Sequence, residues 1–501
     1  MEKLKSYSQM LKTKLFKIEA GKLVCILNKV DAAELGVMAG DKVEIKNTRN
    51  NLVSVAIVDE TTTMVGENSV GLFSEVANKI GVTSTELVQV TPIPKLASNE
   101  AIRKKLDGIK LNDEEIFEIV KDITEDKISD IEAIAFTCAV YMKGFDLEET
   151  VSMTKALIKT GKRIDFGVDN VVDKHSLGGV NGRATMIIVP IVASAGFFMP
   201  KTSSRSITSA AGTADAMEVL APVDLSFEKI KSITKKCGGV IAWGGAMDLA
   251  PADDKIIKLR HPLSIDPEGQ VVASVLAKKA SAGSKHVVID LPVGPNVKIK
   301  DKADALRLAK KLVYVGEKVG LEVEAIITDG INPSGAAFGP ALEAKLAMQI
   351  LEGKIFDNLA QKSCELAGSI FELAGYCRAG QGEIKAREIL KSGKALEKMK
   401  EIIKAQGGKV TSSTQIILSS LNKDIHAQSN GVITEYNIKT LTKIARYAGA
   451  PANAFAGVLL NKMVGEKVSK GDVLLTIFAE NERKLDLAIE VANKLDYIKI
   501  K

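Results

Sequence analysis

Aromatic side chains and charge of one sign are both in short supply in this sequence. Aromatic residues make up 4% of the 501 residues and include one tryptophan. Proteins that bind nucleic acid commonly stack bases on aromatic rings and present a stripe of positive charge. Here the net charge of +6 is the difference between 68 basic and 62 acidic residues spread along the chain. We therefore expect no nucleic-acid partner, whereas a mildly basic chain suits phosphorylated small molecules.

Cysteine is scarce as well, and its positions form no motif. The five cysteines are odd in number and show neither a Cys-x-x-Cys pair nor a Cys/His spacing typical of a metal site. They are Cys25, Cys138, Cys237, Cys364 and Cys377. This argues against a disulfide framework and a zinc site. We expect a reducing, cytoplasmic compartment and catalysis without a metal ion or other cofactor.

Long apolar runs are missing too. No run reaches the roughly 18 residues that suggest a membrane-spanning helix. Residues 1–17 alternate lysines with apolar residues and lack the continuous apolar core of a signal peptide. We therefore expect no membrane association. With 46% hydrophobic and 26% charged residues, the composition is that of a globular protein, and the length predicts about three or four domains.

The first half of the chain predicts a small barrel followed by helices. Residues 1–90 contain short strand patterns around a helical turn, which predict a β-barrel-like domain with a role in assembly. Residues 95–168 show helical periodicity with cap signals before three apolar runs. The segment 250–281 returns to a helical pattern interrupted by prolines, so we add it to this all-helical domain.

The remaining chain predicts an α/β domain and a β-rich end. Residues 169–249 and 284–408 alternate strand and helix patterns, so we expect an α/β phosphate-binding domain with a central mixed sheet. Residues 409–501 form a C-terminal α+β domain in which turn and strand patterns suggest a barrel-sandwich-like arrangement. The fold class is therefore multi-domain α/β.

The first chemical motif follows an apolar stretch that ends at residue 172. Lys174, His175, Ser176 and Gly178 lie within seven residues and precede a second apolar run. A strand, a glycine turn and a helix start in this order make an anion site, because backbone N–H groups and the helix dipole face the anion. The lysine adds charge and the serine adds a donor. The alternative is a tight turn that only closes a strand.

The second motif spans residues 201–215, where nine of fifteen residues carry a hydroxyl group or a positive charge. Hydroxyls, an arginine and small residues that open a helix suit the recognition of phosphate or ribose. A solvated linker has a similar composition, but this segment lies between two apolar stretches. The two motifs are about one strand–helix unit apart, so we expect them at the same edge of a parallel sheet, where open α/β sheets bind ligands.

Both motifs resemble those of the thymidine and pyrimidine-nucleoside phosphorylase family. Residues 174–180 match its Lys-His-Ser-x-Gly-Gly-Val loop, and residues 203–218 match its longer signature with Ser, Arg, Gly-Thr, Asp and Glu. Further matches lie at residues 273–279, 328–330, 339–343 and 445–451. The resemblance covers about residues 5–500. The AMP phosphorylase branch fits best, because it shares the extra N-terminal barrel and a closely similar version of residues 204–209.

The resemblance implies an activity and a set of site residues. It implies a pentosyltransferase that cleaves AMP, and also CMP and UMP, with inorganic phosphate as co-substrate, in nucleotide salvage. It implies a homodimer or larger homo-oligomer whose dimer contact lies near residues 98–163. The implied nucleotide and substrate contacts are Gly178, Ser204, Arg205, Ser206, Ile207, Thr208, Ser209, Thr213, Ser274 and Lys298. Lys174, His175 and Ser176 are expected to bind phosphate, and Lys278 follows a base-contacting lysine of the nucleoside enzymes.

Asp266 is the proton donor that the resemblance implies. In an apolar segment flanked by proline we expect a carboxylic acid to have a raised pKa, which suits proton transfer to a purine nitrogen. The alternative is an aspartate that caps the helix after Pro267.

Two alternatives to a nucleotide phosphorylase remain open. Arg260 keeps an arginine of the nucleoside enzymes while Ile257 replaces their tyrosine, so a thymidine (pyrimidine-nucleoside) phosphorylase is one alternative. A non-catalytic nucleotide-binding protein is the other, although the presence of Lys174, Arg205 and Asp266 argues against it.

Overall fold

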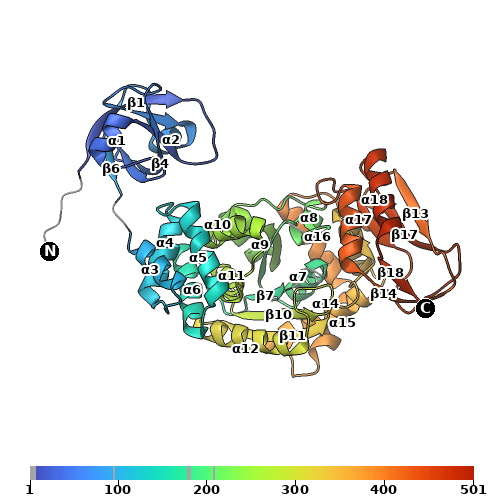
Figure 1. The fold of residues 1–501 in the computed structure, drawn as a ribbon. Coiled ribbons are helices and arrows are strands. Elements are labelled where there is room, and N and C mark those ends of the chain that lie inside the picture. The colour runs from blue at the N-terminus through green and yellow to red at the C-terminus, as the bar shows by residue number, and fades with distance from the viewer. Residues whose placement is uncertain (1–6, 94–95, 178–181, 207–208) are drawn as a thin grey trace. The chain divides into compact units, whose positions relative to one another are not determined.

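The computed structural model describes residues 7–93, 96–177, 182–206 and 209–501 (Figure 1). The chain divides into two compact units. The first contains residues 1–144 and 255–265, and the second contains residues 145–254 and 266–501. The domain boundaries given above stay a prediction, and each unit is described by itself.

The first unit begins with a closed six-stranded barrel in the order β1-β5-β2-β4-β3-β6. Its elements are β1 (Gln9–Phe16), β2 (Val24–Asn28), α1 (Lys29–Leu35), β3 (Lys42–Asn47), β4 (Val53–Thr61), β5 (Ser69–Phe73), α2 (Ser74–Ile80) and β6 (Leu87–Pro92). β1 closes the barrel because it pairs with β5 on one side and β6 on the other. Alternating residues such as Val43, Ile45, Val58 and Leu72 fill the interior. The predicted barrel is confirmed.

Three of the four helices that follow begin where the sequence predicts caps. The four helices are α3 (Ala97–Leu106), α4 (Asp113–Thr124) and α5 (Asp130–Lys143) in the first unit and α6 (Leu147–Thr160) in the second. Asn112, Ser129 and Asp146 each accept a hydrogen bond from the backbone of a glutamate three residues later, whose carboxylate bonds back to the cap. Each such capping box satisfies two backbone N–H groups that a helix start otherwise leaves unpaired.

Prolines divide the segment 250–281 as predicted. Its elements are α10 (Pro251–Arg260), the short 3₁₀ turn η3 (His261–Leu263) and α11 (Glu268–Ser281). Pro262 lies inside η3 and Pro267 is the N-cap of α11. Proline lacks the backbone N–H that a continuous helix needs at these positions. The boundary between the two units falls within α10, and α11 belongs to the second unit.

A parallel sheet forms the centre of the second unit (Figure 1). β11 (Glu322–Asp329), β10 (His286–Val293) and β7 (Val172–Ser176) pair side by side, as do β8 (Met199–Ser203) and β9 (Gly239–Trp243). A parallel bridge between Val171 and Phe198 joins the two sets. The sequence predicts a mixed sheet, but each of these pairings is parallel. The reason is that a helix follows each strand and returns the chain to the same end of the sheet.

Helices surround this sheet, and all of them except α12 (Lys302–Lys318), which packs in a separate apolar cluster, contribute to the largest apolar core. They are α7 (Thr185–Ser194), α8 (Thr213–Glu218), α9 (Phe227–Cys237), α12 (Lys302–Lys318), α13 (Pro340–Leu351), α14 (Asn358–Leu373), α15 (Gly382–Lys391) and α16 (Lys394–Gln406), with 3₁₀ turns η1 (Gly182–Ala184) and η2 (Gly244–Ala246). α7 is apolar on all sides and buried from Thr185 to Ala193, because other helices and the sheet surround it. α12 packs against β10 and β11.

The C-terminal region contains two further sheets. Its elements are η4 (Ser413–Gln415), β13 (Asn422–His426), β14 (Gly431–Tyr436), α17 (Ile438–Ala448), β15 (Gly457–Leu460), β16 (Lys467–Val468), β17 (Val473–Phe478), α18 (Glu482–Lys494) and β18 (Ile498–Ile500). The strand β12 (Ala337–Phe338), which precedes α13, joins one sheet in the order β12-β15-β17-β13. The other has the order β16-β14-β18. Of the helices in the described part of the chain, none is both long and apolar enough to cross a bilayer.

Candidate active site

Parallel strands bring the two predicted motifs to one edge of the sheet. β7 ends at Ser176 and β8 ends at Ser203, and the two strands run in the same direction. On β10, Asp290 accepts hydrogen bonds from the Ser176 hydroxyl at 2.7 Å and from the Thr328 hydroxyl at 2.5 Å. Polar side chains of β7, β10 and β11 thus meet near this edge. The predicted common edge is confirmed.

A buried ion cluster lies beneath this edge. Asp173 is fully buried, and its two carboxylate oxygens contact Lys201 Nζ at 3.1 Å and Lys279 Nζ at 2.6 Å. Lys201 also donates to the backbone carbonyl of Lys174 at 2.7 Å. Burial raises the pKa of Asp173, but the two lysines lower it by more, so its pKa lies below the ordinary value. Asp173 therefore stays ionised and fixes the positions of both ammonium groups.

Lys174 is also buried, but side chains alternate along β7, so it lies on the opposite face of the sheet from Asp173. Its ammonium group donates to the Ser176 hydroxyl, which in turn donates to Asp290. Burial lowers the pKa of Lys174 to about 8 and that of Lys201 to about 7. The two buried groups together hold three lysines, called here the lysine cluster, and two aspartates. A bound anion favours the protonated lysines, so the cluster suits a phosphate group.

His175 is a neutral imidazole in this setting. Burial and the surrounding lysines lower its pKa well below the ordinary histidine value. A neutral ring offers one donor and one acceptor but no charge. His175 therefore suits a hydrogen bond to an uncharged group, such as a sugar hydroxyl, better than an ion pair with phosphate.

The serine-rich segment, here residues 203–206 and 209–212, continues from β8 to the start of α8. Asp215 organises it by accepting backbone N–H groups of Ser206 at 2.7 Å and Gly212 at 2.8 Å. Ser206 Oγ donates to the Ser209 carbonyl at 2.6 Å. Ser203 Oγ is buried and has no hydrogen-bond partner in the described residues. A buried hydroxyl without a partner is costly unless a ligand completes it.

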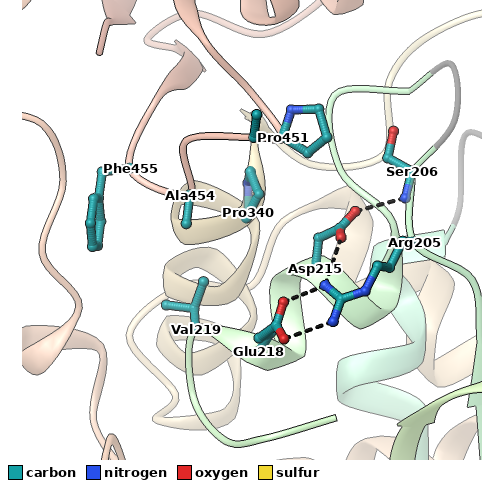
Figure 2. A pocket seen from close by; sticks show the side chains of 10 residues that line it. Arg205, Ser206, Asp215, Glu218, Val219, Pro340, Pro451, Ala454 and Phe455 are labelled. Carbon is teal, nitrogen blue, oxygen red and sulfur yellow. Dashed lines mark hydrogen bonds and ion pairs between the residues drawn. The ribbon is translucent and has the colours of Figure 1, made fainter. Parts of the chain in front are cut away.

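Arg205 is engaged within the protein. Its guanidinium group bonds to both carboxylate oxygens of Glu218, lies 3.6 Å from Asp215 and stacks 5.2 Å from the centre of the Trp243 ring. Arg205, Asp215 and Glu218 border a cavity of about 570 Å³ whose other wall includes Pro340 and the loop around Pro451 to Phe455 (Figure 2). An anion that binds Arg205 must therefore compete with two carboxylates.

Helices α10 and α11 contain a second polar cluster. Ser274 Oγ donates to the buried Asp253 at 2.6 Å. Lys278 contacts both Asp253 and Asp254 at 2.8 Å. Burial lowers the pKa of Lys278, but the two carboxylates outweigh this effect and raise it above the ordinary value. Lys278 is thus a permanent cation on the same face of α11 as Ser274.

Asp266 does not lie in the apolar surroundings expected for it. Its carboxylate accepts a hydrogen bond from Lys298 at 2.7 Å, and their side chains are 46% and 63% exposed, respectively. The two predicted substrate residues are therefore brought together, in a polar setting. The segment looks apolar in the sequence because Ile265 and Pro267 flank the aspartate, but neither prevents its side chain from reaching Lys298.

The other predicted residues divide into two groups. Ser204 is exposed at the start of the serine-rich segment, and Thr213 is the first residue of α8. Gly178, Ile207 and Thr208 lie outside the described residues. Lys201, Ser203 and Lys279 lie within motifs found in the sequence but were given no role there, and Asp173 and Asp290 were not proposed as site residues. The available signal was an ionisable residue within an apolar parallel strand, as in the buried Asp290 of β10.

Family comparisons agree with this arrangement. Family models match residues 99–161 (glycosyl transferase family, helical bundle domain), 168–396 (glycosyl transferase family, α/β domain) and 432–499 (pyrimidine nucleoside phosphorylase C-terminal domain). Anthranilate phosphoribosyltransferase from Thermus thermophilus shares the fold over 62% of this chain and 99% of that chain, with a TM-score of 0.54 and 18% identity. The fold and the matched domains define an enzyme of a glycosyltransferase family.

Relatives that match nearly the whole chain show which family it belongs to. The chain is 47% identical to AMP phosphorylase 1 of Archaeoglobus fulgidus over 95% of its own length and 94% of that protein. It is 44% identical to the AMP phosphorylase of Methanococcoides burtonii over 97% and 96% of the two lengths. The chain belongs to the AMP phosphorylase family.

Proposed function

We propose that the protein cleaves nucleoside 5′-monophosphates with inorganic phosphate, so that AMP and phosphate give adenine and ribose 1,5-bisphosphate. The observation that carries this proposal is the buried cluster of Lys174, Lys201 and Lys279 at the carboxyl edge of the sheet. Ser203 and the serine-rich segment continue from the same edge and offer a second set of donors. Two neighbouring groups of donors suit two phosphates, one attacking and one on the 5′ carbon.

The chemistry follows from these positions. A phosphate oxygen attacks C1′ of the ribose, a new C–O bond forms, and the C1′–N9 bond breaks. Its electron pair leaves with adenine, which accepts a proton at N7. The lysine cluster holds the nucleophile in line, which removes an entropic cost of the reaction. In the transition state positive charge builds on the sugar and negative charge on the base, so a proton donor near the base lowers the barrier.

Asp266 is the proposed proton donor, and Lys298 controls when it acts. Lys298 holds the Asp266 carboxylate through a hydrogen bond of 2.7 Å. Binding of an anionic nucleotide offers Lys298 another partner. Once Lys298 turns to the substrate, the Asp266 side chain can turn to the base and donate a proton to it.

A comparison of substrates tests the proposal. Phosphate-dependent release of base is measured in parallel for AMP, CMP, UMP, adenosine, thymidine and uridine. We expect turnover of AMP, and also of CMP and UMP, with little turnover of nucleosides. If adenosine reacts as well as AMP, the 5′-phosphate site is wrong. Preference for thymidine identifies a nucleoside phosphorylase, and AMP binding without base release identifies a non-catalytic binding protein.

The proposal also covers the role of the enzyme in the cell and its assembly. The products of such a reaction place the enzyme in nucleotide salvage or degradation, in the cytoplasm. The protein is proposed to form a homodimer or larger homo-oligomer, with the dimer contact on the helices of residues 98–163. On α5, Ile131 and Met142 lie three helical turns apart on one face and are 78% and 75% exposed, which supports an apolar contact there.

A further inference from the structure

The serine-rich segment is anchored in the core of the C-terminal region. Ala210 is only 3% exposed and belongs to the same apolar cluster as Leu441, Ile444 and Ala448 of α17. A small side chain fits there because the segment passes close to the helix. The position of neighbouring Ser209 is therefore tied to α17.

Arg446 adds a hydrogen bond to the apolar contact between Ala210 and α17. The buried residues of α17 include Leu441, Ile444 and Ala445, so Arg446 lies in the last turn on the exposed side. Its guanidinium group donates to the Ser209 carbonyl at 3.0 Å. The same carbonyl accepts the Ser206 hydroxyl at 2.6 Å. The Ser209 carbonyl oxygen thus links Arg446 to Ser206. The backbone N–H of Ser206 donates to Asp215.

The helix that carries Arg446 is itself fixed to the α/β part of the second unit. β12 pairs with β15 of the C-terminal sheet, and Ala341 N–H bonds to the Ala454 carbonyl at 2.9 Å. The contact is so close that a Cβ atom on Gly457 would lie 2.2 Å from the Phe338 carbonyl oxygen. These contacts fix the position of α17, and therefore of Arg446, relative to the α/β part.

We propose that Arg446 is a positioning residue that holds the serine-rich segment in its binding geometry, so that the C-terminal region sets the affinity for the nucleotide. The proposal rests on the proposed function, because it assigns this segment to the nucleotide. Arg446 acts through Ser209 and Ser206, whereas the attacking phosphate belongs to the lysine cluster on β7, β8 and α11. Loss of Arg446 is therefore expected to affect nucleotide binding and to leave phosphate binding unchanged.

Steady-state kinetics of Arg446→Ala measures this separation. We expect the KM for AMP to rise about tenfold, the effect of losing one hydrogen bond from a charged group, while kcat and the KM for phosphate stay within about twofold. Arg446→Lys keeps the charge and a donor, and should recover most of the loss. Lys443→Ala is the matched control, because Lys443 is an exposed cation one turn earlier on α17 and contacts Tyr447. It should behave as the wild type.

Hydrogen exchange of the peptide over residues 209–213, without substrate, measures the anchor independently of the reaction. Exchange should be faster in Arg446→Ala than in Lys443→Ala, and Ala210→Val, which crowds the same contact, should act in the same direction. If Arg446→Ala matches the control in both exchange and KM for AMP, the proposal is overturned. A uniform loss of kcat and of both affinities also overturns it, since that pattern belongs to general destabilisation. If the wild type cleaves no nucleotide, the proposed function fails, whereas exchange still decides whether Arg446 anchors the segment.

Discussion

Replacing Asp173 with asparagine tests the electrostatic basis of the site. The change keeps the size of the side chain and removes the charge that Lys201 and Lys279 share. Removing one partner of a buried ion pair costs about 3–5 kcal/mol, because the other charge stays buried without compensation. Lys201 has a pKa of about 7 and can release its proton, which limits the loss. We therefore expect a decrease of about 3 kcal/mol in the free energy of unfolding.

Urea unfolding at neutral pH measures this decrease, and Trp243 is a convenient probe. It is the single tryptophan of the chain and lies at the end of β9, in the parallel sheet. Asp248→Asn is the matched control. The Lys162–Asp248 pair has a distance of 3.0 Å, but its side chains are 62% and 60% exposed. Asp248 has a φ of 51°, which asparagine also tolerates, so we expect a change below about 1 kcal/mol.

The contribution of Asp173 to the free energy of unfolding should decrease in acid. The pKa of Asp173 is lower in the folded protein than its ordinary value. Its stabilising effect is therefore complete above the unfolded pKa of about 3.9 and is lost as pH falls through the folded pKa. The wild type should lose its advantage over Asp173→Asn in acid. If the two differ by no more than the Asp248 control does at neutral pH, the buried cluster does not stabilise the fold and our account of it is wrong.

Three further predictions address the acid, the lysine cluster and the barrel. Asp266→Asn should lower kcat by roughly 10²–10⁴ with less effect on KM; an unchanged kcat in the AMP assay assigns Asp266 to structure. Folded Lys201 has a pKa of about 7, below an unfolded value of about 10.4, so the unfolded chain holds the extra proton between these values and stability should rise with pH there. Lys201→Met should flatten that rise in urea unfolding. Deleting residues 1–93 removes all six barrel strands and should leave a smaller particle by light scattering that still cleaves AMP; an unchanged particle size contradicts a role of the barrel in assembly.

Local signals in the sequence predicted the elements well. The capping boxes at Asn112, Ser129 and Asp146 depend on residues three apart, so the sequence contains the whole motif. The common edge of the two anion motifs followed from the strand–helix alternation, because parallel strands end on the same side. The mixed character expected for the sheet was wrong in detail, since local patterns do not show which strands pair.

Long-range contacts explain what the sequence did not predict. Asp173 and Lys279 are 106 positions apart, and only the fold brings their side chains within 2.6 Å. The same holds for Lys298, which changes the surroundings of Asp266. Arg205 looked like a free phosphate ligand in the sequence, but Glu218 and Asp215 on the next helix engage it. Residue type predicted the chemistry at these positions, whereas the partners depend on the three-dimensional arrangement.

Closure of the N-terminal barrel limits how that domain can associate. Because β1 pairs on both sides, the six described strands leave no edge with a row of free N–H and C=O groups. A neighbouring copy cannot extend this sheet by adding a strand. Contacts through the barrel must instead use side chains on its outer surface, where they depend on individual residues and on ionic strength rather than on backbone pairing.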